Sequence, residues 1–282
     1  MFGKSQDQNV GSGAVGMQAG RDVNIGMSFT EVRELCHLFL QKNFPALRAE
    51  AKAAADERVQ EFTLKLEQRI ADAATKINPA KFSDPDVQAC LNDAVLSAAR
   101  RGDAANPDVL CTLVAERISA ISSPFKDIVL SEAVQVVSKL TGEQISLLSL
   151  TFFVQSMSFK NLPSLFFLEA IGLKARDTVE RSKGLSQSQK QHMQYAGTCS
   201  VLNMVTHDPF EVIWNQYKNL GHTNIADFKE NLHREAPTYY KIVDLYSTNE
   251  LWCLTLTSVG QAIALASLSS ALTNLDFSIW LH

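Results

Sequence analysis

The chain has 282 residues, a formal net charge of −4, and 46% apolar against 20% charged residues. This composition is typical of a folded globular protein and excludes disordered and fibrous classes. The acidic balance also excludes a general nucleic-acid coat, because phosphate binding depends on concentrated Lys and Arg.

A glycine-rich stretch, residues 1–27, predicts a β-forming oligomerisation segment. Six of the thirteen glycines fall in it, and apolar residues alternate on both sides of Gly20-Arg21-Asp22 with the two-residue period of strands. An isolated hairpin is marginal in water, so we expect it to pair with copies from other subunits. The alternative is that Arg21 and Asp22 are solvated turn residues. The expected contact residues are Val15, Met17, Gln18, Arg21, Asp22, Val23, Asn24 and Ile25.

Residues 28–174 predict a helical domain with one long amphipathic helix. Ser28 and Glu31 have capping-box spacing, which predicts a first helix that ends at Asn43-Phe44-Pro45. Apolar residues then recur every three or four positions from Leu47 to Ile77, where Asn78-Pro79 ends the pattern. The opposite face is charged, which indicates a solvated surface.

Shorter helices follow in this domain, three of them opened by a capping residue and a proline. These starts are Asp84-Pro85, Asn106-Pro107 and Ser123-Pro124, and Arg100-Arg101-Gly102 is a stop signal. The charge-free stretch Ile145–Met157 predicts the central core helix. Core positions are also predicted on the shorter helices, at Val87, Cys90, Ala94, Ala98, Leu110, Leu113, Val114, Ile118, Ile121, Ile128, Val134 and Val137.

A basic stretch, residues 175–190, predicts a linker before a C-terminal domain, 191–282. The basic residues at this junction form a candidate nucleic-acid patch, composed of Lys174, Arg176, Arg181, Lys183 and Lys190. The domain predicts four helices, then a strand at Glu250–Leu254, a helix at Leu256–Leu265 and a last strand at Phe277–Leu281. This small α+β arrangement resembles the end of a winged-helix domain. From Pro209 onward, however, four Lys and Arg face seven Asp and Glu, the opposite of a DNA reader.

No motif in the sequence indicates a cofactor, and none indicates a metal site. Gly11-Ser-Gly13-Ala-Val-Gly16 matches G-x-G-x-x-G but does not lie between a strand and a helix. His192, Cys199 and His207 have no zinc-module spacing. The pair Asp84 and Asp86 is typical of a helix cap, with a nuclease carboxylate pair as the alternative.

The cysteines and the charge pattern predict a cytoplasmic protein. The cysteines are odd in number and widely spaced inside apolar patterns, which is typical of reduced core thiols. Residues 1–25 are polar and predict no secretory signal. No charged residue occurs from Leu251 to Leu275, so a membrane span remains an alternative on length, although Ser, Thr, Gln and Gly favour a buried strand and helix. The cysteines are Cys36, Cys90, Cys111, Cys199 and Cys253.

Two regions together resemble a known family. Gln18–Ile25 resembles short glycine-rich β segments at the ends of bacterial conflict proteins, where such segments mediate assembly. With Leu256–Ala264 and Phe277–Trp280, most of the chain is similar to an uncharacterised bacterial family of about this length. The resemblance implies a bacterial cytosolic protein linked to phage defence, and it supplies no catalytic residues.

The sequence as a whole predicts a mostly α protein: a multi-helix domain with an N-terminal β-hairpin-like segment and a small α+β, winged-helix-like C-terminal domain. We expect a non-enzymatic homo-oligomeric scaffold or sensor in bacterial antiviral defence, whose partners are itself and another protein of phage or host. One alternative is a winged-helix nucleic-acid-binding regulator that uses the basic stretch. Another is a membrane-perturbing effector that uses Leu251–Thr273. An enzyme with a scattered active site also stays open, because such sites are spatial rather than sequential.

Overall fold

The computed structural model describes residues 30–34, 44–160, 162–182, 184–201, 208–272 and 275–282. The chain divides into two compact units, Met1–Ala53 and Ala54–His282. The predicted β segment, 1–27, and all eight of its contact residues lie outside the described residues, as does the Ser28 cap. In the first unit, residues 30–34 are helical and helix α2 (Phe44–Asp72) begins. Pro45 lies in the first turn of α2, where its missing amide hydrogen costs no hydrogen bond.

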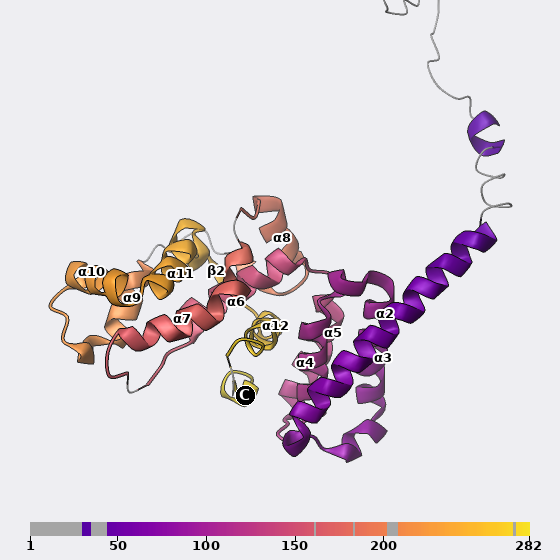
Figure 1. Cartoon of the computed structure of the whole chain (residues 1–282), viewed down its shortest axis with the longest axis horizontal. Helices are drawn as coiled ribbons and strands as arrows, with labels where there is room; N and C mark the ends of the chain where they lie inside the picture. The colour runs from indigo at the N-terminus through magenta and orange to yellow at the C-terminus, as the bar shows by residue number, and fades with distance from the viewer. Residues whose placement is uncertain (1–29, 35–43, 161, 183, 202–207, 273–274) are drawn as a thin grey trace, which may run out of the picture. The chain divides into compact units, whose positions relative to one another are not determined.

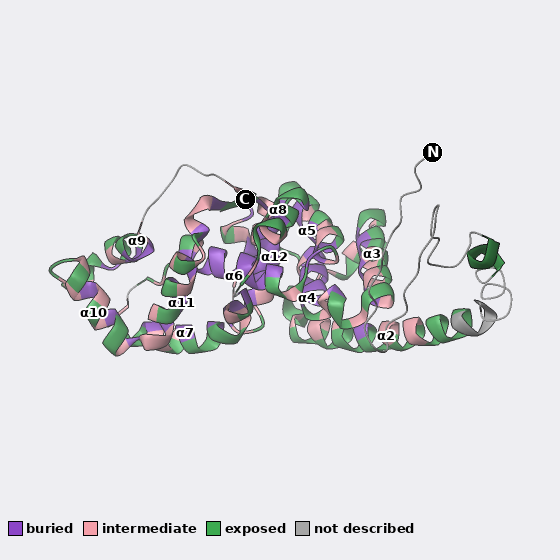
Figure 2. Ribbon diagram, turned by 90° about the horizontal axis from the view of Figure 1, so that it is seen from above, coloured by how far each residue is buried: buried purple, intermediate pink, exposed green. Residues whose placement is uncertain are grey.

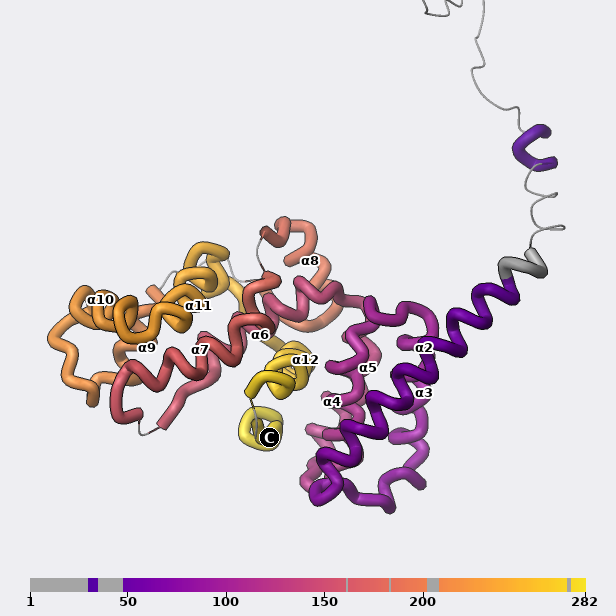
Figure 3. Tube along the Cα trace, in the orientation of Figure 1, coloured from indigo at the N-terminus to yellow at the C-terminus, as the bar shows by residue number. Residues whose placement is uncertain are grey.

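The described chain is mostly helical, as predicted (Figures 1 and 3). After α2 the α-helices are α3 (Pro85–Arg101), α4 (Pro107–Arg117), α5 (Pro124–Val137), α6 (Gly142–Ser156), α7 (Phe166–Val179), α8 (Gln187–Tyr195), α9 (Pro209–Gln216), α10 (Ile225–Glu235), α11 (Pro237–Thr248) and α12 (Ser258–Leu268). The short 3-10 helices are η1 (Ala74–Lys76), η2 (Pro79–Ser83), η3 (Gly102–Ala105), η4 (Glu180–Ser182), η5 (Lys218–Leu220), η6 (Leu251–Cys253) and η7 (Phe277–Ile279). Strands β1 (Cys199–Val201) and β2 (Leu254–Leu256) pair antiparallel, with Ser200 opposite Thr255.

The helices begin mostly where capping chemistry predicts. The Asp84 side chain accepts from the Asp86 amide at the start of α3, and Ser123 accepts from Lys126 at the start of α5. Such caps satisfy amides that have no partner inside the helix. Asn106 differs, because it has left-handed backbone and its amide group donates to the Leu140 carbonyl instead of capping α4.

Helix α6 is the centre of the core, as the charge-free stretch from Ile145 onward predicts. Every residue from Gln144 to Val154 is buried, and Thr141 and Gln144 close its N-terminus with a capping box. Helix α12 packs against α6 and also contacts α4 and α5 (Figure 2). A helix that is buried all round carries few charges, and Glu143 in the first turn is the single charged residue of α6.

Two glycines allow close backbone approaches in the second unit. A Cβ added to Gly172 of α7 would lie 2.8 Å from the Tyr239 amide nitrogen of α11. A Cβ added to Gly260 of α12 would lie 2.0 Å from the Thr198 carbonyl oxygen. Glycine at these positions therefore sets how closely the neighbouring segments pack.

The C-terminal strands differ from the prediction. Residues 251–253 form η6, so the strand lies at Leu254–Leu256 rather than Glu250–Leu254. The predicted last strand is wrong, because Phe277–Ile279 forms η7. Asp276 caps this turn through the Ser278 amide and hydroxyl, at 2.9 and 2.7 Å. Phe277 and Leu281 are buried with helical spacing, whereas strand alternation would also bury Ile279, which is exposed.

The structure also differs from the prediction at two core positions and at the predicted linker. Ile121 and Ile128 are more than half exposed, at 54% and 58%. The stretch predicted as a linker, 175–190, includes the end of α7, all of η4 and the start of α8. Ala175 and Val179 within it are buried, so this stretch belongs to the packed unit.

Candidate functional site

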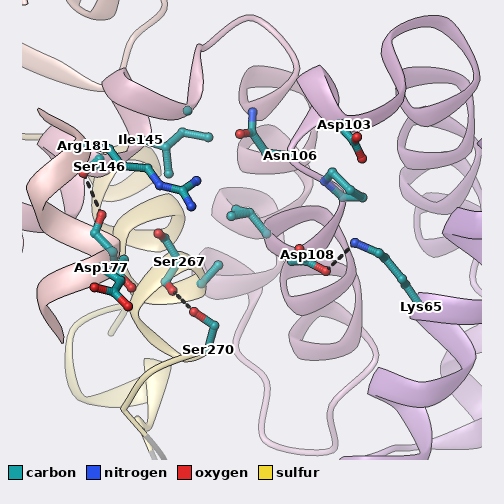
Figure 4. A pocket seen from close by; sticks show the side chains of 15 residues that line it. Lys65, Asp103, Asn106, Asp108, Ile145, Ser146, Asp177, Arg181, Ser267 and Ser270 are labelled. Carbon is teal, nitrogen blue, oxygen red and sulfur yellow. Dashed lines mark hydrogen bonds and ion pairs between the residues drawn. The ribbon is translucent and has the colours of Figure 1, made fainter. Parts of the chain in front are cut away.

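A polar cleft of about 400 Å³ lies between α4, α6, α12 and the junction of α7 with η4 (Figure 4). Lys65 of α2 and Asp103 of η3 complete its rim. Its lining includes three carboxylates, two cations, one amide and several hydroxyls beside apolar surface. Pockets of this size accommodate small molecules, and their few polar groups fix the orientation of a ligand.

The cations on the two walls have different surroundings. Lys65 Nζ lies 3.0 Å from Asp108 Oδ1 at the start of α4, so its charge is already paired. Arg181 of η4 points into the cleft, and no described residue forms a hydrogen bond or ion pair with its guanidinium (Figure 4). Backbone and Thr141 hydrogen bonds lower the pKa of the Glu143 carboxyl, and attraction to the Arg181 charge contributes to this lowering. The planar group of Arg181 has no hydrogen-bond or ion-pair partner among the described residues, and it suits a carboxylate or phosphate.

The carboxylates of the cleft likewise include paired and unpaired groups. Asp177 of α7 accepts from Arg176 Nε at 3.2 Å, and Asp108 is paired with Lys65. The Asp103 carboxylate has no hydrogen bond or ion pair from the described residues, and it lies across the cleft from Arg181 (Figure 4). The cleft thus presents one free positive and one free negative group on opposite walls. This arrangement is complementary to a small ligand with an anionic end and a hydrogen-bond-donor end.

The hydroxyls of the cleft are not arranged for nucleophilic catalysis. Ser146 Oγ donates to the Thr178 carbonyl at 2.6 Å, and Ser270 Oγ donates to the Ser267 carbonyl at 2.7 Å. An activated serine instead donates its proton to a base such as histidine. No histidine or cysteine lines this cleft. The arrangement favours binding over acyl transfer.

Two thiols and one histidine outside this cleft have structural surroundings. Burial raises the pKa of the Cys90 thiol to about 11 and that of Cys111 to about 12, so both are protonated at neutral pH. His192 Nδ1 lies 3.2 Å from Gln144 Nε2. Among the residues that the structure describes, no group of three or more His, Cys, Asp or Glu side chains could hold a metal ion. His207 lies outside these residues.

The four described residues of the candidate nucleic-acid patch are spread over α7, η4 and α8. Lys190 Nζ donates to the Asn249 carbonyl at 3.0 Å, and Arg176 pairs with Asp177. Lys174 is exposed on α7, Arg181 lines the cleft, and Lys183 lies outside the described residues. Two of these charges are thus already engaged within the chain.

The uncharged run Leu251–Leu275 includes η6, β2 and α12. Within the described ranges, no helix is long and apolar enough to cross a membrane. Most of α12 is buried in the core, with Ala262 to Leu265 fully covered.

The cleft has no signal in the linear sequence. Its lining residues come from many segments between Lys65 and Ser270. In the sequence, Arg181 stands out only as one charge of the basic stretch. The capping pattern at Asn106-Pro107 was the nearest clue, because it places Asp108 in the first turn of α4.

Comparison with known proteins gives one match. The model of a protein family, with the description ":-like", matches residues 26–224 and 213–281. The chain belongs to this family. The match is consistent with the predicted resemblance to an uncharacterised family, while the bacterial source, the motifs quoted for it and the link to phage defence stay predictions. No curated protein matches the chain, and no solved structure does.

Proposed function

We propose that this protein is a non-enzymatic homo-oligomeric sensor that binds a small polar ligand and acts in bacterial antiviral defence. The observation that carries the sensing role is the pair of free charges, Arg181 and Asp103, on opposite walls of the cleft. The ligand has an anionic group for Arg181 and a donor group for Asp103. Amino acids and nucleoside monophosphates have this bipolar chemistry.

The position of the cleft supports a coupling of ligand binding to the fold. Its walls come from helices on several sides of the core, including α4, α6 and α12. A ligand that bridges opposite walls favours the conformation in which those walls are correctly spaced. Assembly through Val15–Ile25 is the corresponding output, supported by the alternating pattern of that segment.

A binding experiment tests the input. Thermal unfolding of the full chain is measured with each proteinogenic amino acid and each nucleoside monophosphate. We expect at least one of these probes to raise the melting temperature, and Arg181→Gln to remove the increase. The matched control is Lys174→Gln, which removes an exposed charge from α7 outside the cleft. The sensing role is wrong if no probe stabilises the protein, or if Arg181→Gln responds like the wild type.

A measurement of the mass in solution tests the proposed assembly. Light scattering coupled to size exclusion is applied to the full chain and to a chain that begins at Ser28. We expect the full chain to be oligomeric and the shortened chain to be monomeric. A monomeric full chain contradicts the oligomeric role. Salt-sensitive retention on DNA would instead support the nucleic-acid alternative, and leakage from liposomes the membrane alternative.

A further inference from the structure

A second cleft, of about 470 Å³, lies where α9, α10 and α11 meet η6. Its walls combine the aromatic rings Phe210, Tyr240 and Trp252 with the carboxylates Asp208 and Asp244. Lys229 and Ser247 also line it. Aromatic faces and carboxylates are both attractive to cations, so the chemistry of this cleft differs from that of the first.

One carboxylate of this cleft, Asp208, is already paired with a cation of the chain itself. Lys229 Nζ lies 2.7 Å from Asp208 Oδ2 and 4.8 Å from the centroid of the Phe210 ring. Phe210 in turn packs against Tyr240, with ring centroids 4.9 Å apart. Asp208 and Lys229 therefore neutralise each other, and one aromatic face is in use.

Three other side chains that line the cleft are acceptors without a hydrogen-bond partner among the described residues. The Asp244 carboxylate, the Tyr240 hydroxyl and the Ser247 hydroxyl receive no hydrogen bond from any residue that the structure describes. Trp252 is half-buried beside them. Because the charges of Asp208 and Lys229 neutralise each other, the net charge of the lining is the single negative charge of Asp244. The chain from Pro209 onward is also acidic, with four Lys and Arg against seven Asp and Glu, which attracts a cationic partner.

We propose that this cleft binds an arginine side chain from a flexible segment of a partner protein. A guanidinium has five N–H donors in a plane, so it can reach the Asp244 carboxylate and the neighbouring hydroxyls together. Its flat face stacks on an indole ring. A trimethylated amine has no N–H donor and leaves those acceptors unpaired. A lysine ammonium has only three donors and no flat face to stack.

The test uses the full chain and three short peptides that differ at one position. Acetylated, amidated Gly-Gly-X-Gly-Gly is titrated with X as arginine, lysine or citrulline, the neutral isostere of arginine. Binding is followed by NMR through the indole N–H of Trp252, which is assigned with Trp252→Phe. We expect the arginine peptide to shift this signal and to bind at least about tenfold more tightly than the citrulline peptide, because the charge-assisted hydrogen bonds are lost in citrulline.

Two variants locate the interaction. Asp244→Asn keeps the size of an exposed side chain and removes its charge, and we expect it to weaken binding of the arginine peptide by about tenfold. Glu230→Gln is the matched control, because Glu230 is exposed on α10 and does not line the cleft. We expect no change in the control.

Three outcomes overturn the proposal. These are equal binding of the arginine and citrulline peptides, equal binding of the arginine and lysine peptides, and unchanged affinity in Asp244→Asn. Absence of any Trp252 shift with the arginine peptide overturns it as well. None of these outcomes bears on the first cleft, so the sensing proposal is tested separately.

Discussion

Arg117 Nη2 donates to Asp86 Oδ2 across 2.7 Å, which joins the end of α4 to the first turn of α3. The arginine side chain is only 4% exposed. Its Nε donates to Ser131 of α5, and its Nη1 lies 3.3 Å from Asp127 Oδ2, without hydrogen-bond geometry. One buried guanidinium thus connects three helices, and Asp86 has a structural partner rather than a place in a nuclease pair.

Replacing this arginine should destabilise the fold. Arg117→Met fills similar space but removes the guanidinium from Asp86 and Asp127, which keep Ser131 and Lys81 as partners. We expect a loss of about 2–4 kcal/mol in the free energy of unfolding. This lies toward the low end of the losses seen when a buried ion pair is broken, because both carboxylates retain some access to water. Urea unfolding measures it. Arg176→Met is the control: its pair with Asp177 is exposed, so a change below about 1 kcal/mol is expected. Equal effects in the two variants would contradict the assigned role.

The pair of Arg117 and Asp86 also predicts that the free energy of unfolding depends on pH. The hydrogen bond from Arg117 holds the pKa of Asp86 below its usual value. A carboxyl with a lowered pKa in the folded state gives stability that is present above the unfolded pKa, about 4, and lost as pH falls through the folded pKa. We expect Asp86→Asn to flatten the acid side of the plot of unfolding free energy against pH. Parallel curves for the variant and the wild type would show that Asp86 does not contribute.

The approach of α7 to α11 predicts the effect of a single methyl group. Alanine is favoured over glycine in helices by about 1 kcal/mol. At Gly172, however, the added Cβ meets the Tyr239 backbone at 2.8 Å, so we expect Gly172→Ala to lower the melting temperature. Gly142→Ala at the start of α6 is the matched control, because its nearest neighbour is 3.7 Å away. Calorimetry measures both, and stabilisation by Gly172→Ala would refute the close approach.

The burial of two thiols predicts that they are protected from alkylation in the native protein. Burial raises the pKa of Cys90 to about 11 and of Cys111 to about 12, so little thiolate forms at about pH 8. We expect iodoacetamide to leave both unlabelled in the native protein and to label both in urea. Mass spectrometry of the peptides gives the extent of reaction at each cysteine. Rapid native labelling of Cys90 or Cys111 would contradict the packing described here.

The sequence predicted those features that depend on neighbouring residues. The caps at Asp84 and Ser123 follow from side chains that reach amides two or three positions away. The core position of α6 follows from the absence of charge after Gln144. Ile121 and Ile128 show the limit of this reasoning, because an apolar residue in a periodic pattern is buried only when another element covers it.

The clefts could not be predicted in the same way. Arg181 and Asp103 become neighbours of one cavity only through the packing of α4, α6, α7 and α12. Phe277, Ile279 and Leu281 alternate like a strand, yet no described strand pairs with them, and Asp276 caps a turn instead. Pairing partners and cavity walls are properties of the tertiary structure, so no local pattern encodes them.

The packing of α12 on α6 has a consequence for synthesis on the ribosome. α6 emerges early, whereas α12 follows only after α7 to α11. Until α12 has left the exit tunnel, the surface of α6 that it covers stays open. Because contacts between distant parts of a chain form slowly and exposed apolar surface promotes aggregation, nascent chains stalled before Ser258 should be clients of chaperones.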